Sequence, residues 1–220
     1  MKVTLGEDVL VDNNTAAAFN REQFSKHNTL VINLMSSPGA GKTTLLQKTV
    51  SRLAEDFRIG VIEGDLATEI DANRIREAGA KAVQINTGGG CHLDARMIAK
   101  TLPEFDLDEI DILFIENVGN LVCPSGYDLG QNHKIAILSV PEGNDKIPKY
   151  PVMFRRTEMV VLNKIDLLPY LDFSVDQAIE DLKGINPESY LMSVSARTDE
   201  GMDQWIDWIR SAYQKCQGQS

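Results

Sequence analysis

The stretch Ser36-Ser37-Pro38-Gly39-Ala40-Gly41-Lys42-Thr43-Thr44 decides the fold of this chain. It follows an apolar run at residues 29–35, which predicts a buried strand, and it leads into residues 43–55, which predict a helix. A strand, a glycine turn and a helix N-terminus direct backbone N–H groups and the positive end of a helix dipole at one point. This stretch therefore predicts a polyphosphate-binding loop.

The side chains of this loop carry specific expectations. Lys42 would reach the β- and γ-phosphates of a nucleoside triphosphate, and Thr43 would ligate magnesium. The strict pattern begins with a glycine where this chain has Ser36, but two later glycines still supply the permissive turn. A glycine loop that merely joins a strand to a helix is the alternative, and Gly-Lys-Thr-Thr in this context argues against it. The remaining nucleotide contacts are expected from Gly39, Ala40, Gly41 and Thr44.

Strand and helix patterns alternate along the rest of the chain. Strands are expected at residues 29–35, 58–62, 81–85, 111–115, 134–140, 158–162 and 190–194. Helices are expected at residues 12–27, 43–55, 68–78, 92–101, 175–182 and 202–213. The alternation predicts an α/β fold with a doubly wound, mostly parallel sheet, helices on both faces, and a ligand at the carboxyl ends of the strands.

Composition limits the class of protein. A chain of 220 residues with 43% hydrophobic and 25% charged residues fits one globular domain, and no apolar run is long enough to span a membrane. The start MKVTLGEDVL lacks the features of a secretory signal, so we expect a cytoplasmic location without membrane attachment. A net charge of −10 argues against nucleic acid as a partner.

A base-recognition loop is predicted after the strand at residues 158–162. Asn163, Lys164 and Asp166 form an N-K-x-D tetrad there, and the Asp166 carboxylate can accept from both N1–H and the N2 amine of guanine. Adenine offers a lone pair at N1 and no amine at C2, so the tetrad favours guanine. Further on, Ser195 and Ala196 lie in a stretch similar to the second base loop of GTPases, where a backbone amide would meet the guanine oxygen.

Acidic residues at two strand ends are candidates for magnesium, which prefers oxygen ligands. Asp65 follows one strand and Glu116 follows another; either could ligate the metal with Thr43 or orient the attacking water. Asp71 ranks below them because it is more easily explained as a solvated turn residue. Lys42, Asp65 and Glu116 are thus the catalytic candidates.

A nucleotide switch is predicted from Glu116 to Gly119. Its spacing matches the D-x-x-G switch of GTPases, with Gly119 in the place whose amide senses the γ-phosphate. Asn120 follows, where a glutamine would be expected to orient water in a fast GTPase. We therefore expect slow hydrolysis by the isolated protein.

Two further segments bring soft ligands to strand ends. Cys91 and His92 follow a run of three glycines, and Cys123 lies just beyond the switch. Thiolate and neutral imidazole suit nickel or zinc rather than magnesium. A fourth ligand could be water or a group from a second subunit. The alternative is that the cysteines are small buried hydrophobes and His92 a capping residue; Cys216 has no neighbouring ligand.

Taken together, the motifs SSPGAGKTT, EGDLATEIDA, NTGGGCHLDA, FIENVGNLVCP, NKIDLLPY and SVSARTDEG resemble the hydrogenase nickel-incorporation GTPases of the HypB family. The resemblance covers residues 29–213. It implies a P-loop GTPase domain at residues 29–220 after an N-terminal helical segment at residues 1–28. It also implies GTP, Mg²⁺, and Ni²⁺ or Zn²⁺ held by Cys91, His92 and Cys123 in a site that responds to the GTP state.

The same resemblance implies a nucleotide-dependent homodimer that works with the hydrogenase large subunit and other maturation proteins. Many family members carry a cysteine-rich motif or a histidine-rich tract at the N-terminus, and MKVTLGEDVL has neither. Nickel handling is therefore expected at the internal site. Two other functions stay open: a related GTPase serving urease or a cobalamin-dependent mutase, and a nucleotide-dependent small-molecule kinase.

Overall fold

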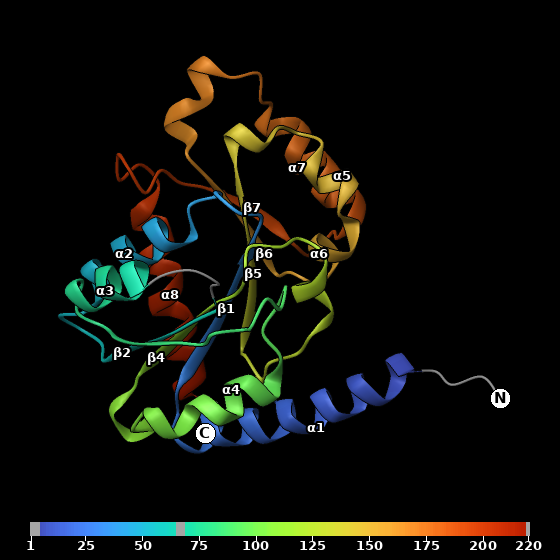
Figure 1. Cartoon of the computed structure of the whole chain (residues 1–220). Coiled ribbons are helices and arrows are strands. Elements are labelled where there is room, and N and C mark those ends of the chain that lie inside the picture. Colours follow the sequence, from blue (N-terminus) through green and yellow to red (C-terminus); the bar gives the residue numbers. More distant parts are fainter. Residues whose placement is uncertain (1–4, 65–68, 219–220) are drawn as a thin grey trace.

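The computed structural model describes residues 5–64 and 69–218 (Figure 1). Within these residues, seven strands form one sheet in the order β3-β2-β4-β1-β5-β6-β7, and every adjacent pair is parallel. The strands are β1 (Leu30–Ser36), β2 (Ile59–Glu63), β3 (Lys81–Gln84), β4 (Ile112–Glu116), β5 (His133–Ser139), β6 (Met159–Asn163) and β7 (Tyr190–Ser193). The predicted α/β class and doubly wound sheet are confirmed.

Helices cover both faces of this sheet. The α-helices are α1 (Leu5–Lys26), α2 (Lys42–Leu53), α3 (Glu69–Glu77), α4 (Ala95–Thr101), α5 (Lys146–Lys149), α6 (Pro151–Arg155), α7 (Val175–Ile185) and α8 (Met202–Gln217). Short 3₁₀ helices are η1 (Leu102–Glu104), η2 (Leu107–Glu109), η3 (Cys123–Gly126), η4 (Val140–Glu142) and η5 (Ile165–Tyr170). Among the helices of the described chain, none combines the length and apolar character that a membrane span requires.

The alternation of side chains along β1 explains the layers. Leu30, Ile32 and Leu34 are fully buried in the core shared with α2, α3 and α8. Val31 points to the opposite face, where Phe24 of α1 and Ile98 of α4 complete a second apolar cluster. A strand buried on both faces is apolar throughout, which is why residues 29–35 read as a continuous hydrophobic run. Figure 1 shows α1 lying alongside α4 under the sheet.

Several helices differ from the sequence expectation. Helix α4 begins at Ala95, not at residue 92, because the Asp94 side chain accepts a hydrogen bond from the Met97 N–H at 2.8 Å and caps the helix. His92 therefore lies in the preceding loop. Helices α5 and α6 were not expected, since Pro148 and Pro151 interrupt the pattern; both prolines lie in the first turns, where proline is tolerated. Helix α1 begins earlier than expected, at Leu5.

Candidate functional site

The phosphate-binding loop joins the end of β1 to the start of α2. Gly39 and Gly41 have φ angles of 77° and 94°, in the left-handed region that favours glycine. A Cβ atom at Gly41 would also lie 2.6 Å from Asn163 Nδ2, so a side chain there would collide with the predicted base loop. Gly41 caps α2, and the N–H groups of the first helical turn face the loop.

The charged and hydroxyl groups of the loop have defined positions. The Lys42 ammonium donates to Ser36 Oγ at 2.9 Å, and the Thr43 hydroxyl donates to Glu116 Oε1 at 2.8 Å. Glu116 ends β4 and is buried. A hydroxyl and a carboxylate in contact are a donor set that suits Mg²⁺. Asp65 lies outside the described residues; Asp71 lies in the first part of α3.

A cavity of about 570 Å³ opens over this loop. Gly119 also lines this cavity, and it is so close to the loop that a Cβ atom there would lie 3.1 Å from the Pro38 backbone. Arg74 of α3 also lines the cavity, and sequence reasoning missed it because an isolated arginine in a helix carries no motif. The cavity lining is Pro38, Gly39, Gly41, Lys42, Thr43, Thr44, Arg74, Glu116, Val118, Gly119 and Lys164.

A second cavity of about 290 Å³ adjoins the first and is lined by the predicted base loops. Its walls include Gly41, Thr44, Asn163, Lys164, Asp166, Leu167, Ala196 and Arg197, of which Gly41, Thr44 and Lys164 also line the phosphate cavity. The two cavities thus form one path from the phosphate loop to the N-K-x-D tetrad.

Hydrogen bonds hold the tetrad in place. Asn163 donates from Nδ2 to the Ala40 carbonyl at 3.1 Å, and its Oδ1 accepts from the Ala196 N–H at 3.3 Å. Lys164 is in the left-handed region at φ 61° and donates to the Gly39 carbonyl at 2.6 Å. Asp166 Oδ1 accepts from the Ser195 hydroxyl at 2.7 Å. Ser195 therefore orients the carboxylate that would read the base.

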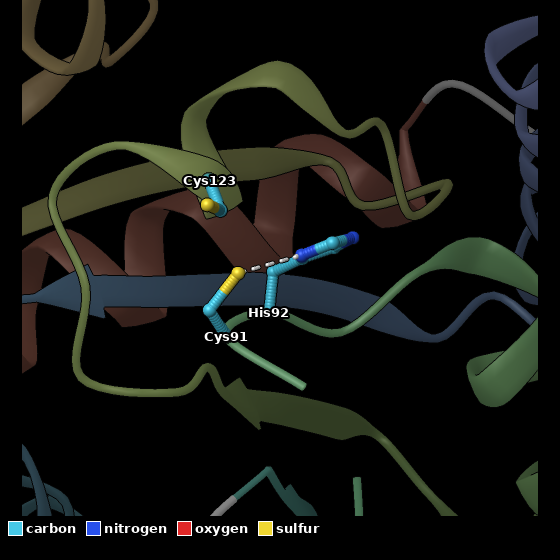
Figure 2. Close-up of side chains that lie close together, drawn as sticks. All are labelled: Cys91, His92 and Cys123. Carbon is cyan, nitrogen blue, oxygen red and sulfur yellow. Dashed lines mark hydrogen bonds between the residues drawn. The ribbon is translucent and has the colours of Figure 1, made fainter. Parts of the chain in front are cut away.

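The predicted soft ligands come together at the same edge of the sheet. A ligand atom from each of Cys91, His92 and Cys123 lies within 4.8 Å of the other two. Figure 2 shows Cys91 and His92 on the segment after β3, and Cys123 on η3, reached from a different strand. The His92 ring also stacks on Tyr127, with ring centroids 3.9 Å apart. Sequence spacing predicted the three ligands but gave no sign of Tyr127.

The surroundings of these ligands influence their protonation. A hydrogen bond with Cys123, and desolvation, raise the pKa of the Cys91 thiol. Burial lowers the pKa of His92, which Asp94 opposes in part. The imidazole is therefore neutral at pH 7, the form that binds a metal ion, while the Cys91 thiol must lose its proton to do so.

The switch segment after β4 contacts the loop that carries Cys91. Asn117 is buried, and its Oδ1 accepts from the Val118 N–H at 3.0 Å and from the Leu93 N–H at 3.1 Å. Asn120 donates to the Cys91 carbonyl at 3.4 Å. The backbone beside the soft ligands is thus bonded to residues that flank Gly119.

The fold and this site define a P-loop nucleotide-binding protein that has, beside the nucleotide cavities, a cluster of candidate ligands for a soft metal ion. Residues 30–193 match the family described as CobW/HypB/UreG, nucleotide-binding domain. The hydrogenase maturation factor HypB of Escherichia coli (strain K12) is 54% identical over 95% of this chain and 71% of its own length. The chain belongs to the HypB family of hydrogenase maturation factors.

Other relatives agree with this assignment. The hydrogenase/urease maturation factor HypB of Helicobacter pylori is 41% identical over 94% of this chain and 86% of its own length. A crystal structure of HypB from Helicobacter pylori in complex with nickel matches with a TM-score of 0.87 and 40% identity, covering 93% of this chain and 96% of that one. A crystal structure of the hydrogenase maturation factor HypB from Archaeoglobus fulgidus matches with a TM-score of 0.88 and 39% identity, covering 93% of this chain and 100% of that one.

Proposed function

We propose that this protein is a GTP-hydrolysing metallochaperone that helps insert nickel into [NiFe] hydrogenase. It acts in the cytoplasm with the hydrogenase large subunit and other maturation proteins, as a homodimer whose formation depends on nucleotide. Its family and its 54% identity to a hydrogenase maturation factor support hydrogenase as the recipient of the nickel. The nickel complex of the Helicobacter pylori relative supports the cargo.

The nucleotide half of the proposal rests on the two adjoining cavities. Backbone N–H groups of the loop and the Lys42 ammonium bind the phosphates, and the Asp166 carboxylate, oriented by Ser195, accepts from the guanine edge. Thr43 and Glu116, with Asp65, would hold Mg²⁺, which supplies positive charge to the phosphates. Arg74 adds a cation to the phosphate cavity.

The cargo half rests on Cys91, His92 and Cys123. Two thiolates and an imidazole suit Ni²⁺ or Zn²⁺, and three ligands leave one position for water or for a group of a second copy. An incomplete set is appropriate for a protein that must release its metal, because an exposed ligand can be replaced by one from the recipient. Cys91 is exposed.

The observation that carries the proposal is the contact between the two halves. Gly119 lies against the phosphate loop, and Asn117, two residues earlier, accepts from the Leu93 N–H next to the metal ligands. A rearrangement of the switch on GTP hydrolysis would therefore move the Cys91–His92 segment or break this hydrogen bond. Nucleotide state and metal geometry would then be coupled through a buried contact.

Delivery of nickel to urease is a second candidate. The Helicobacter pylori relative bears the name hydrogenase/urease maturation factor at 41% identity. The same site would serve either recipient, since both functions need nickel release from a GTP-controlled carrier.

Equilibrium dialysis with Ni²⁺ and with Zn²⁺ tests the proposal. We expect stoichiometric metal binding by the full chain, with an affinity that differs between GDP and a non-hydrolysable GTP analogue. Cys91→Ala and Cys123→Ala should each abolish stoichiometric binding and leave the GTP affinity measured without Ni²⁺ or Zn²⁺ unchanged, because neither cysteine lines the nucleotide cavities.

Cys216→Ala is the matched control, because Cys216 is half-buried on α8 and lies outside the ligand cluster. It should bind metal like the wild-type protein. Full metal retention in Cys91→Ala and Cys123→Ala would exclude the proposed cargo site. Phosphate transfer to a small-molecule acceptor, without metal binding, would favour a kinase instead.

A further inference from the structure

The two segments that carry the soft ligands are loops, so something outside them must hold their relative position. Cys91 and His92 precede α4, and Cys123 begins η3, well separated in the chain. The N-terminal helix α1 contacts the continuation of both segments, and two buried asparagines of α1, Asn13 and Asn20, form hydrogen bonds to both.

Asn20 bridges the two segments with one side-chain amide. Its Nδ2 donates to the Ala95 carbonyl at 2.8 Å and to the Leu129 carbonyl at 3.1 Å, and the residue is fully buried. Ala95 is the first residue of α4 and closely follows His92. Leu129 lies just after Tyr127, the residue whose ring stacks on His92.

Asn13 makes a second bridge between the same segments. Its Oδ1 accepts from the Ala95 N–H at 2.9 Å, and its Nδ2 donates to the Asp128 carbonyl at 2.9 Å. Asn13 and Asn20 are two helical turns apart and so lie on one face of α1. A buried polar group that bonds both partners is costly to remove, because the partners are left unsatisfied.

The backbone of α1 also packs directly on the segment that runs from Cys123 to Gly130. A Cβ atom at Gly130 would lie 2.7 Å from the Ala17 carbonyl oxygen and 2.8 Å from Asn20 Cβ. Gly130 has a φ of 89°, so only glycine allows both this turn and this close approach. At the rim, Arg21 pairs with Asp128 at 2.7 Å.

We propose that α1 positions the metal centre, with Asn13 and Asn20 as the positioning residues that hold the Cys91–His92 segment against the segment that runs from Cys123 to Gly130. This inference rests on the proposed cargo site. It assigns α1 a role that its sequence did not indicate: metal affinity depends on how α1 is docked, although α1 contributes no ligand to the cluster formed by Cys91, His92 and Cys123.

The test compares Asn20→Ala and Asn13→Asp with the full wild-type chain. Asn13→Asp keeps the acceptor for the Ala95 N–H and loses the donor to the Asp128 carbonyl. It therefore breaks the hydrogen bond to the Cys123–Gly130 segment and keeps the one to α4. Ni²⁺ affinity is measured by competition with a chromophoric chelator, and site geometry by the thiolate-to-nickel charge-transfer absorption. We expect affinity to fall about tenfold or more and the absorption to shift, as for residues that orient metal ligands.

Asn14→Ala is the matched control, since Asn14 is an exposed asparagine on the same helix. It should leave both readouts unchanged, and GDP affinity should be unchanged in all variants. Loss of GDP binding in Asn20→Ala would mean that this variant does not fold properly, and the result for Asn13→Asp then tests the inference. Wild-type Ni²⁺ affinity and absorption in Asn13→Asp would overturn this inference alone. A wild-type chain that binds no Ni²⁺ at Cys91 and Cys123 would overturn both the cargo site and this inference.

Discussion

Ser36 stands where the strict phosphate-loop pattern has glycine, and the structure gives it a role. Its hydroxyl accepts from the Lys42 ammonium at 2.9 Å, an interaction that glycine could not make. Ser37, the next residue, donates to Glu142 and so anchors the loop to the turn after β5. The departure from the pattern therefore adds side-chain contacts to the loop while Gly39 and Gly41 keep its conformation.

At Asp166, a single substitution tests the choice of base. Asp166→Asn replaces an acceptor with a donor opposite guanine N1–H and N2, so we expect GTP affinity to fall by roughly 10- to 100-fold. Xanthosine triphosphate, which presents a carbonyl in place of the amine, should bind better to the variant than to the wild type. Calorimetric titration with both nucleotides measures this.

The control for the base is Asp172→Asn, because Asp172 is exposed a short distance along the chain and lines neither nucleotide cavity. It should leave both affinities as they are. Unchanged GTP affinity in Asp166→Asn would remove the assignment of guanine to the tetrad.

Among the elements, β5 supports the loop that carries Cys123. Lys134 of β5 donates to the Tyr127 carbonyl at 2.9 Å and the Ser125 carbonyl at 3.3 Å. Burial lowers the pKa of Lys134 from 10.5 to about 8; Asp128 opposes this effect and Arg156 adds to it. The lysine thus satisfies carbonyl groups of η3 and of the residue that follows it, and its charge is partly desolvated there.

This shift predicts a pH dependence of stability. Between pH 8 and pH 10.5 the unfolded chain holds the Lys134 proton more often than the folded chain does. The contribution of Lys134 to the free energy of unfolding should therefore rise with pH across this window, by at most about 1.4 kcal/mol per pH unit. Chemical denaturation at pH 8, 9 and 10 measures the slope. Lys134→Met should lose this component, and an identical slope in the variant would contradict the prediction.

Strand positions followed from the sequence because a strand buried between two helical layers must be apolar along its whole length. The ends of those strands then placed Lys42, Asp166 and Cys123 at one edge, since parallel strands all finish on the same side of a sheet. The start of α4 was predicted at residue 92 and lies at Ala95, because the Asp94 side chain caps the helix. The positions of Arg74 in the phosphate cavity and of Tyr127 against His92 depend on which segments lie close together in the folded chain. The spacing of residues along the sequence does not predict this.

In the whole molecule, the parallel sheet brings two chemistries to a common edge. Oxygen atoms that suit a hard cation lie near Thr43, and sulfur and nitrogen atoms that suit a softer one lie near Cys123, so the proposed Mg²⁺ and Ni²⁺ would each meet the donor type that they prefer. The predicted switch from Glu116 to Gly119 contacts both groups: Glu116 accepts from the Thr43 hydroxyl, and Asn117 accepts from the Leu93 N–H next to His92. Helix α1 packs against the segments that continue from the second group.

The surface around the soft ligands predicts where a second copy binds. Cys91 is exposed, and Val122, beside Cys123, exposes 61% of its surface. A two-fold dimer over this surface would bury Val122 and bring ligands from both copies together. We expect light scattering to give twice the chain mass with a non-hydrolysable GTP analogue, Mg²⁺ and Ni²⁺, and the single chain mass with GDP.

Val122→Glu should weaken that dimer at least tenfold, because burying an unpaired carboxylate at an interface is costly. Tyr190→Glu is the matched control: Tyr190 exposes 45% of its surface at the start of β7, the end of the strand opposite the ligand edge, and its change should leave the dimer intact. GDP affinity should stay the same in both variants, since neither residue lines the nucleotide cavities and GDP leaves the chain monomeric. A full dimer of Val122→Glu would place the interface elsewhere, and the missing metal ligand would then come from water or from the recipient protein.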